Sequence, residues 1–531
     1  MQAFQGGYSA DDGDQAAVPL VTDGQRRNSD TEDHSHVSAD YRALSVSEVA
    51  DIHNEELLDI PFSEIFTPQR LKSEGLLLVR SSMPIVLSSM SQLLLMIPLM
   101  AAVGRLGTIA LASMNLVSIY AGLCGVAPIL GFPMALDSLC SQAYTAATDR
   151  KLLGVYLQRV LVVGFMFEAA MYPLWWYSRA VYEYLGIPAD IAEATSSVLR
   201  LYFFGMLLLL VYECLKSYLF AQGIRRIAVI SQIIVLPVGW LAVWLLIANT
   251  STSLGILGIP SVIIIVFMGF TAVAIVFIAK VDGAQCWGGW SRAAFMDLGH
   301  VVKLAFAGSA IAVFESIALH TIDIGVLFMD AQTMAAQAIL NTMLVSIYMV
   351  GTGFAVAVCN RVGNLLGLGQ PNRALLAVHT MVFIASSLFV ILGVTLISHR
   401  EQMATMFTPD PEIADILIAH IPWMVVCSVI QGINMAFNGI MRGQGRQTLI
   451  ARIRILSFIC VCIPFSAAGV MLFNWGLAGL WFGYLSSVSC TLLCQIYMVA
   501  TTDWEKEIER CRRRVSNSML VYSAGQTNQL G

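Results

Sequence analysis

Three side chains that can exchange protons fall within one apolar stretch, residues 301–328. They are Glu315, His320 and Asp323, and His320 and Asp323 are helix-surface neighbours at i,i+3. Ionisable residues at membrane depth are costly and usually serve a function. A carboxyl or imidazole group that loads and releases a proton near neutral pH is what a proton-coupled exchanger requires. The alternative is a structural hydrogen bond between helices, or, for His320, simple packing in the core.

Two further acids, Glu168 and Glu213, also fall in apolar stretches. Glu213 lies three residues before Lys216, so an ion pair on the helix surface is the simpler interpretation. The sequence has no phosphate-binding loop motif, no nucleophile with a neighbouring base, and no CxxC among its eleven cysteines. We therefore expect no enzyme activity, no metal, no cofactor and no nucleic-acid partner. Energy for transport would come from an ion gradient.

The elements that must position these residues are membrane helices. About twelve apolar stretches lie between Leu76 and Thr501, each near the roughly 20 residues that cross a bilayer. Only 12% of the residues are charged, whereas soluble globular proteins carry roughly 25%. Residues 149–154 resemble residues 372–377, and Gln222-Gly223 recurs as Gln444-Gly445, at offsets of 223 and 222 positions. The sequence predicts an all-α integral membrane protein of twelve transmembrane helices in two pseudo-symmetric six-helix lobes.

The domain boundaries follow from composition and loop length. We expect a first lobe at 76–280, a linker between the lobes at 281–300, and a second lobe at 301–501. Residues 1–75 hold fifteen of the 35 acids and are predicted to be disordered to amphipathic. Lys and Arg gather in the even-numbered loops, which places these loops, the linker and both termini in the cytoplasm. The tail at 502–531 is typical of an amphipathic helix near anionic lipid heads.

Several motifs resemble those of the multidrug and toxic compound extrusion (MATE) family, especially its eukaryotic branch. They run in the expected order from about residue 75 to 510: Ala135–Tyr144, Tyr156–Arg159, Tyr348–Val350, Arg361–Gly367, Gly439–Gly445 and Asp503–Glu507. The resemblance implies two six-helix lobes that form a V and exchange a cation against protons or sodium. Within these motifs we expect structural roles for Asp137, Arg159, Arg361, Gly363, Asn364, Arg442, Gly443 and Gly445. We expect Arg361, Asn364, Arg442 and Arg446 at cytoplasmic helix ends, where cations suit helix C-termini and lipid phosphates.

The resemblance also implies a proton-linked Glu in helix seven, where Glu315 falls. The acid that pairs with it in helix ten falls here on Gln431, which cannot titrate, and a second helix-seven acid falls on His320. One hypothesis is a carboxylate–imidazole set of Glu315 and His320, with Asp323 as a further proton-coupling residue. The other is that Gln431 binds substrate and His320 only packs.

The two halves differ chemically at matching positions. Helix one lacks the Asp of prokaryotic members, and Gln92 stands 223 positions before Glu315. We expect the substrate cavity to be lined by Gln431, Asn341, Gln92 and Tyr348.

The leading hypothesis is a monomeric antiporter that exports organic cations, drugs or secondary metabolites in exchange for protons. It would act in the plasma or vacuolar membrane. Aromatic and Met residues are plentiful and suit flat organic cations. The alternatives are a sodium-coupled antiporter and a lipid or lipid-linked flippase of the same superfold, which would need a wide cationic cavity for a phosphate headgroup.

Overall fold

The computed structural model describes residues 59–249 and 251–530. The described residues belong to one compact unit, residues 56–531. The part of the expected disordered to amphipathic segment 1–75 that precedes residue 59 lies outside the described residues. Everything below concerns this unit.

Twelve helices of this unit are long and apolar enough to cross a membrane. In a span, the helix satisfies its own backbone polar groups, which lipid cannot do. The first six spans are α2 (Pro68–Gly104), α3 with α4 (Thr108–Ala121, Ala127–Ala146), α5 (Leu152–Trp176), α7 (Ala189–Ala221), α8 (Arg226–Val243) and α9 (Gly258–Lys280). The second six are α10 (Leu298–Gly325), α11 (Ala331–Leu368), α12 (Pro371–Ser398), α14 (Pro411–Gly443), α15 with α16 (Gln447–Ser457, Ile463–Ala467) and α17 (Leu477–Ala500).

Short elements join and extend these spans. Two spans are continued through π-helical turns, η2 (Gly122–Val126) between α3 and α4, and η8 (Phe458–Cys462) between α15 and α16. Two further π-turns, η3 (Trp244–Ala248) and η9 (Ala468–Leu472), end their spans. The remaining short helices are η1 (Phe62–Glu64), α6 (Ser178–Tyr184), η4 (Gly255–Leu257), η5 (Ala284–Cys286), η6 (Arg292–Phe295), η7 (Val326–Phe328) and α13 (Arg400–Phe407).

The first span starts earlier than the expected boundary at residue 76. It begins at Pro68, a proline suited to the first turn of a helix. The polar turns that follow include Glu74, which is buried because it pairs with Arg361 of α11. An ion pair across the lobes therefore accommodates a charged helix start that hydropathy alone would place outside the span.

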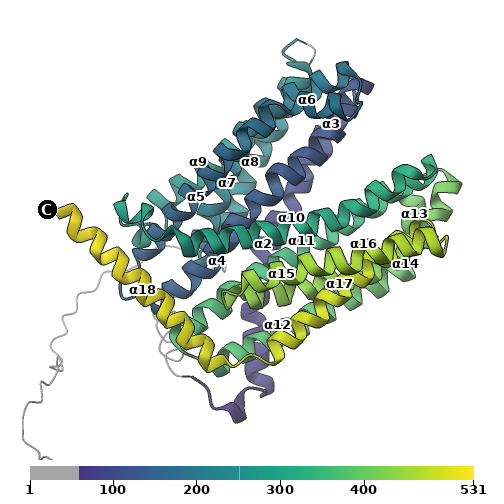
Figure 1. Ribbon diagram of the computed structural model, residues 1–531. Helices are drawn as coiled ribbons and strands as arrows, with labels where there is room; N and C mark the ends of the chain where they lie inside the picture. Colours follow the sequence, from purple (N-terminus) through teal and green to yellow (C-terminus); the bar gives the residue numbers. More distant parts are fainter. Residues whose placement is uncertain (1–58, 250, 531) are drawn as a thin grey trace, which may run out of the picture. The chain divides into compact units, whose positions relative to one another are not determined.

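The two lobes meet through a few helices. α4 packs against α10 and α11, and α2 packs against α11 and α12. Within this unit, Figure 1 shows α5, α7, α8 and α9 on one side and α11, α12, α14 and α17 on the other, with the two sets diverging toward one end. This arrangement places Glu315 of α10 close to the contact between the lobes.

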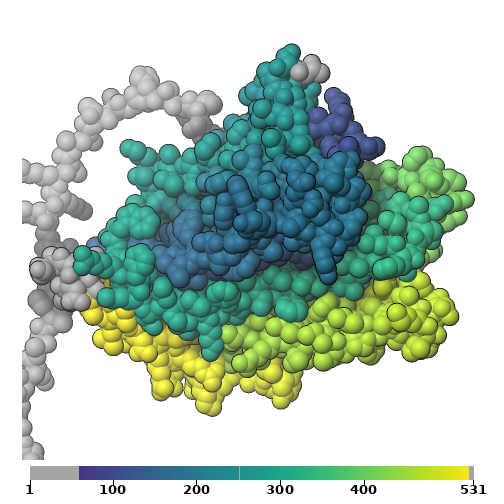
Figure 2. All heavy atoms as spheres, turned by 45° about the horizontal axis from the view of Figure 1, so that its top comes forward, coloured from purple at the N-terminus to yellow at the C-terminus, as the bar shows by residue number. Residues whose placement is uncertain are grey.

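The chain ends in a long helix, α18 (Trp504–Leu530), where the sequence predicts an amphipathic tail. Its buried apolar residues follow a helical spacing: Ile508, Cys511, Val515 and Tyr522. This face packs on α4 and α5 of the first lobe, on α11 and α12 of the second, and on η6 of the linker. The yellow atoms of Figure 2 run along one edge of the unit beside the green second lobe.

Candidate functional site

Glu315 is buried in the middle of α10, and three polar side chains of the second lobe converge on it. Gln431 of α14 donates a hydrogen bond from Nε2 to Glu315 Oε1. Arg454 of α15 holds its Nη1 3.3 Å from the same oxygen. Tyr348 of α11 also lies beside this carboxylate. Only 6% of Glu315 and 3% of Gln431 are exposed, so these contacts form away from water.

Helix geometry explains why Arg454 reaches this acid. Gln431 lies twelve residues before the end of α14 at Gly443, and Arg454 lies seven residues after the start of α15 at Gln447. At 1.5 Å per residue these positions are about 18 Å and about 10 Å from the turn that joins the two helices. The long guanidinium side chain covers the remaining depth.

The sequence alone does not single out Arg454, because a basic residue near the start of a helix normally marks a cytoplasmic loop. The structure buries this side chain, which is only 7% exposed. A signal was present in the spacing: Arg454 falls on the same helical face as Ile450 and Ser457, which are also buried.

Asp323 forms a second, separate group. His320 Nδ1 lies 3.1 Å from Asp323 Oδ2, Gln337 donates to Oδ1 at 3.1 Å, and Asn341 donates to Oδ2 at 3.1 Å. The structure thus places His320 and Asn341 with Asp323 and not with Glu315. Residues five apart on a helix point in directions about 140° apart, so Glu315 and His320 do not share a face.

The other residues expected at the cavity lie apart from one another. Tyr348 and Gln431 line a small cavity of about 10 Å³, together with Leu344, Ser428, Gly432 and Met435. Such a volume holds about one water molecule. Gln92 is half-buried on α2 of the first lobe, and no hydrogen bond joins it to Glu315 among the described residues. A substrate would therefore need this region to rearrange.

The first lobe contains two buried acids of different character. Glu168 of α5 is fully buried, and neither of its oxygens has a hydrogen-bond partner in the described part of the chain. Glu213 pairs with Lys216 at 2.5 Å. Their side chains are only 10% and 15% exposed. The expected surface ion pair is therefore a buried one, and the Lys216 ammonium lies 5.2 Å from the centre of the Tyr212 ring.

Several motif residues join the two lobes. Asp137 of α4 forms a buried ion pair with Arg442 of α14. Gln142 donates to the Gly443 carbonyl at 2.7 Å, and Thr145 donates to the Asn364 carbonyl at 2.8 Å. The expectation that Arg442 faces lipid phosphate is wrong, because its guanidinium is 7% exposed and paired with Asp137. We call this set of contacts, together with Arg361–Glu74, the inter-lobe seam.

Two other motif arginines also have protein partners in place of lipid. Arg361 forms a two-point contact with Glu74, with Nε 2.8 Å from Oε1 and Nη2 2.9 Å from Oε2. Arg446 pairs with Glu507 of α18 at 2.6 Å.

Arg159 holds the linker between the lobes. It is 1% exposed and donates from Nε to the Ala293 carbonyl of η6 at 3.1 Å.

The motif glycines allow close helix contacts. A Cβ on Gly363 would lie 2.0 Å from Ser141 Oγ, and one on Gly443 would lie 2.8 Å from the Cys359 carbonyl. Gly445 has a φ of +75° in the turn between α14 and α15, a conformation that favours glycine.

One further glycine contact was not predicted. A Cβ on Gly131 of α4 would lie 2.0 Å from the backbone nitrogen of Ser309, and a Cβ on Gly308 would lie 2.2 Å from the Gly131 carbonyl. The backbones of α4 and α10 therefore touch where the lobes cross.

Comparison with known proteins identifies the family. The sequence profile of the MatE family matches residues 84–245 and 305–467, one segment in each lobe. The matched segments start 221 positions apart (84 and 305) and end 222 apart (245 and 467), close to the offsets of the internal repeat.

Relatives and solved structures agree with this match. Protein DETOXIFICATION 17 of Arabidopsis thaliana is 27% identical over 85% of this chain and 94% of its own length. Multidrug and toxin extrusion protein 1 of Xenopus tropicalis is 24% identical over 86% of this chain and 79% of its own length. An uncharacterized transporter of Schizosaccharomyces pombe is 25% identical over 89% and 87%.

The fold matches that of a solved structure, the eukaryotic MATE transporter AtDTX14. The TM-score is 0.79 at 20% identity, over 84% of this chain and all of that chain. With the family profile matching both halves, this chain belongs to the MATE family of membrane transporters.

Proposed function

We propose that this chain exports organic cations in exchange for protons, and that Glu315 is the group that alternates between proton and substrate. The observation that carries the proposal is the buried contact of Glu315 with Arg454 and Gln431. In a membrane protein, an ionisable side chain that is buried among other polar groups of the helix bundle usually marks an ion pathway. The name of the Xenopus relative, a multidrug and toxin extrusion protein, supports the substrate class.

The charges around Glu315 explain how proton and substrate would exclude one another. When Glu315 is ionised, it and Arg454 together are neutral, and the carboxylate attracts a cationic substrate. When Glu315 is protonated, the pair carries the single positive charge of Arg454, which repels such a substrate. Gln431 keeps its hydrogen bond in either state because an amide group both donates and accepts.

The interior cations argue against a flippase for phosphate headgroups. Arg454 faces Glu315, Arg442 faces Asp137 and Lys216 faces Glu213. Each of these positive charges is offset by a carboxylate, so together they do not form a cationic path through the spans for a phosphate headgroup.

Glu315→Gln tests the proposal in proteoliposomes loaded with a quaternary ammonium dye. The substitution keeps the shape of the side chain and removes its titration. We expect dye transport driven by an imposed pH gradient to fall at least about tenfold, or about 1.4 kcal/mol of lost coupling.

Glu168→Gln is the matched control, because it makes the same chemical change at a buried acid of the other lobe. We expect this variant to keep transport. Normal pH-driven transport in Glu315→Gln would contradict the proposal. Transport that follows an imposed sodium gradient, and ignores the pH gradient, would show that sodium is the coupling ion.

A further inference from the structure

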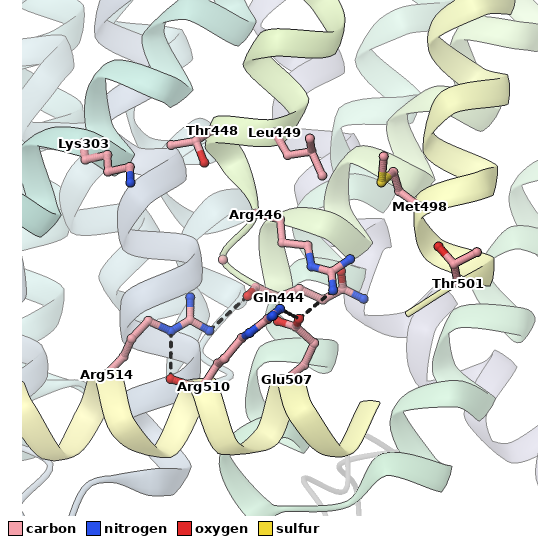
Figure 3. A pocket seen from close by; sticks show the side chains of 11 residues that line it. Lys303, Gln444, Arg446, Thr448, Leu449, Met498, Thr501, Glu507, Arg510 and Arg514 are labelled. Carbon is pink, nitrogen blue, oxygen red and sulfur yellow. Dashed lines mark hydrogen bonds and ion pairs between the residues drawn. The ribbon is translucent and has the colours of Figure 1, made fainter. Parts of the chain in front are cut away.

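A second cavity lies away from Glu315, under the C-terminal helix. It has a volume of about 700 Å³ and sits between α18, the start of α15, the end of α17 and the start of α10. Figure 3 shows Lys303 of α10 and Arg514 of α18 pointing into the same opening from opposite sides. Four helices, from the start of the second lobe to the end of the chain, thus build one cavity.

The charge of this cavity is strongly positive. Its lining includes four cations, Lys303, Arg446, Arg510 and Arg514, and one acid, Glu507. Glu507 is buried, with 1% of the residue exposed. Arg446 and Arg510 both pair with its Oε1 atom. Lys303 and Arg514 have no carboxylate within ion-pair distance among the described residues. Two cations therefore remain without a counter-ion at the cavity.

A buried amide adds an independent observation. Gln444 lines the cavity and is 1% exposed, yet neither its side-chain nitrogen nor its side-chain oxygen has a hydrogen-bond partner among the described residues. A buried polar group without a partner costs roughly 1–3 kcal/mol. A ligand with hydrogen-bonding oxygens would satisfy it.

The arginine at the cavity is held in place by the backbone. Arg514 donates from Nη2 to the Gln444 carbonyl at 3.0 Å and from Nε to the Arg510 carbonyl at 3.3 Å. Its guanidinium lies against the turn at Gly445, where a Cβ would be 1.9 Å from Nη1. A fixed guanidinium beside a flexible ammonium is well suited to bind a phosphate, because Arg offers several donors in one plane and Lys adds a point charge.

We propose that this cavity binds the phosphate group of a phosphomonoester, carried either by an anionic phospholipid or by a soluble molecule. Lys303 and Arg514 neutralise the phosphate, and the Gln444 amide donates to one of its oxygens. Leu449 and Met498 give the cavity an apolar side, which suits the glycerol and first acyl carbons of a lipid. The bound phosphate joins α18 to the ends of α10 and α15.

Binding to the full-length protein in non-ionic detergent is measured by native mass spectrometry. The probes are short-chain phosphatidic acid, short-chain phosphatidylcholine and glycerol 3-phosphate. We expect phosphatidic acid to bind more tightly than phosphatidylcholine, and added salt to weaken its binding. Lys303→Gln and Arg514→Gln should each weaken binding about tenfold, since each removes a charge-assisted contact of about 1.4 kcal/mol.

Arg513→Gln is the matched control. Arg513 lies next to Arg514 on α18, but its side chain is 75% exposed, pairs with Glu509 and does not line the cavity. This variant should bind like the parent. If Arg514→Gln unfolds the protein, Lys303→Gln still tests the proposal. The Lys303 side chain is exposed and holds no ion pair in the described chain, so this substitution should leave the fold intact.

The probes separate the two sources of phosphate. Binding of phosphatidic acid alone assigns the cavity to a lipid, and binding of glycerol 3-phosphate assigns it to a soluble ester or to both. Failure of both phosphate probes to bind the parent protein overturns the proposal. Equal weakening in Arg513→Gln, Arg514→Gln and Lys303→Gln also overturns it, because that result reports general surface charge.

Discussion

Arg454 changes the chemistry expected of the acid in helix seven. A buried ion pair adds little stability compared with apolar residues of the same size, because two charges must lose their water. Its presence at Glu315 therefore favours a functional role over a purely stabilising one. The family resemblance implies that Glu315 works with a second titrating acid at position 431. In this chain position 431 is Gln, and the charged partner of Glu315 is Arg454, which stays protonated.

A double-mutant cycle tests this pair directly. Arg454→Gln leaves a buried carboxylate without its cation, and we expect it to lower the free energy of unfolding by about 3 kcal/mol. Adding Glu315→Gln removes the unpaired charge and should recover much of that loss. Chemical denaturation of the purified protein in detergent measures both. Strictly additive effects of the two substitutions would show that the side chains do not interact.

The contrast between Glu315 and Arg454 shows what the sequence could predict at this scale. Glu315 stood out because acids are rare in apolar stretches, and family spacing pointed to Gln431. Arg454 did not stand out because basic residues near helix starts normally mark loops. Its contact with Glu315 joins positions 139 apart and depends on how far α15 extends before the guanidinium turns inward.

Among the elements, α18 has a role that its composition did not indicate. An amphipathic basic helix at a membrane suggests a lipid-facing position, but this one buries its apolar face on protein. Tyr522 donates to Asp149 beside the first lobe at 3.4 Å, and Arg514 donates to the Gln444 carbonyl beside the second at 3.0 Å. α18 therefore contacts both lobes, and a change in their relative position must alter one of these contacts.

Cys511 reports on this packing. It lies on the inner face of α18 and is fully buried, and burial raises the pKa of its thiol to about 11. Only the thiolate reacts with a maleimide, so at pH 7 about one thiol in ten thousand is reactive. In a variant without the other cysteines we expect very slow labelling that accelerates as the pH rises, and faster labelling during transport if α18 leaves one lobe.

Ser516→Cys supplies the reference for that measurement, because Ser516 lies on the exposed face of the same helix. It should be labelled quickly in the resting protein. If Cys511 reacts as fast as this reference without substrate, α18 does not pack as described.

The sequence predicts that a membrane helix exists more reliably than it predicts where the helix ends or which helix it contacts. The apolar windows were long enough to place twelve spans, because lipid imposes a minimum length on each. The start at Pro68 was missed because the first turns are charged, and their acid is satisfied only by Arg361 from the other lobe. Local composition does not report such long-range pairs.

For the molecule as a whole, the inter-lobe seam is one-sided. The described contacts between the lobes that involve Glu74, Asp137, Gln142 and Thr145 all lie in the helix halves next to the basic loops. Ser309 donates a hydrogen bond to the Pro128 carbonyl at 2.8 Å, next to the Gly131–Gly308 contact. These two contacts between the lobes lie nearer the middle of the spans. We expect the seam to open when the transporter changes the side from which its substrate site is reached.

Gly308→Ala tests the backbone contact between the lobes. A Cβ at this position meets the backbone of α4 at 2.2 Å, and backbone cannot move aside as a side chain can. We expect the added methyl group to force the lobes apart and lower the free energy of unfolding by about 1–3 kcal/mol. Thermal unfolding and dye transport should both decrease.

Gly299→Ala on the same helix is the comparison, since no atom lies within 4 Å of its added Cβ. It should be neutral or slightly stabilising, because alanine favours a helix by about 0.5–1 kcal/mol over glycine. Similar losses in both variants would contradict the contact between the lobes as the cause, because the added Cβ of Gly299→Ala meets no other atom.

We expect the crossing of α4 and α10 to act as a fulcrum when the lobes move. Gly308 lies ten residues into α10 and Gly131 lies fifteen residues before the end of α4, so each helix has a lever arm of about 15–22 Å on the basic side. If the two helices keep this contact and rock about it as rigid bodies, opening the lobes at one face brings them together at the opposite face. The fold would thus prevent a continuous leak of protons by geometry alone, even when no substrate is bound.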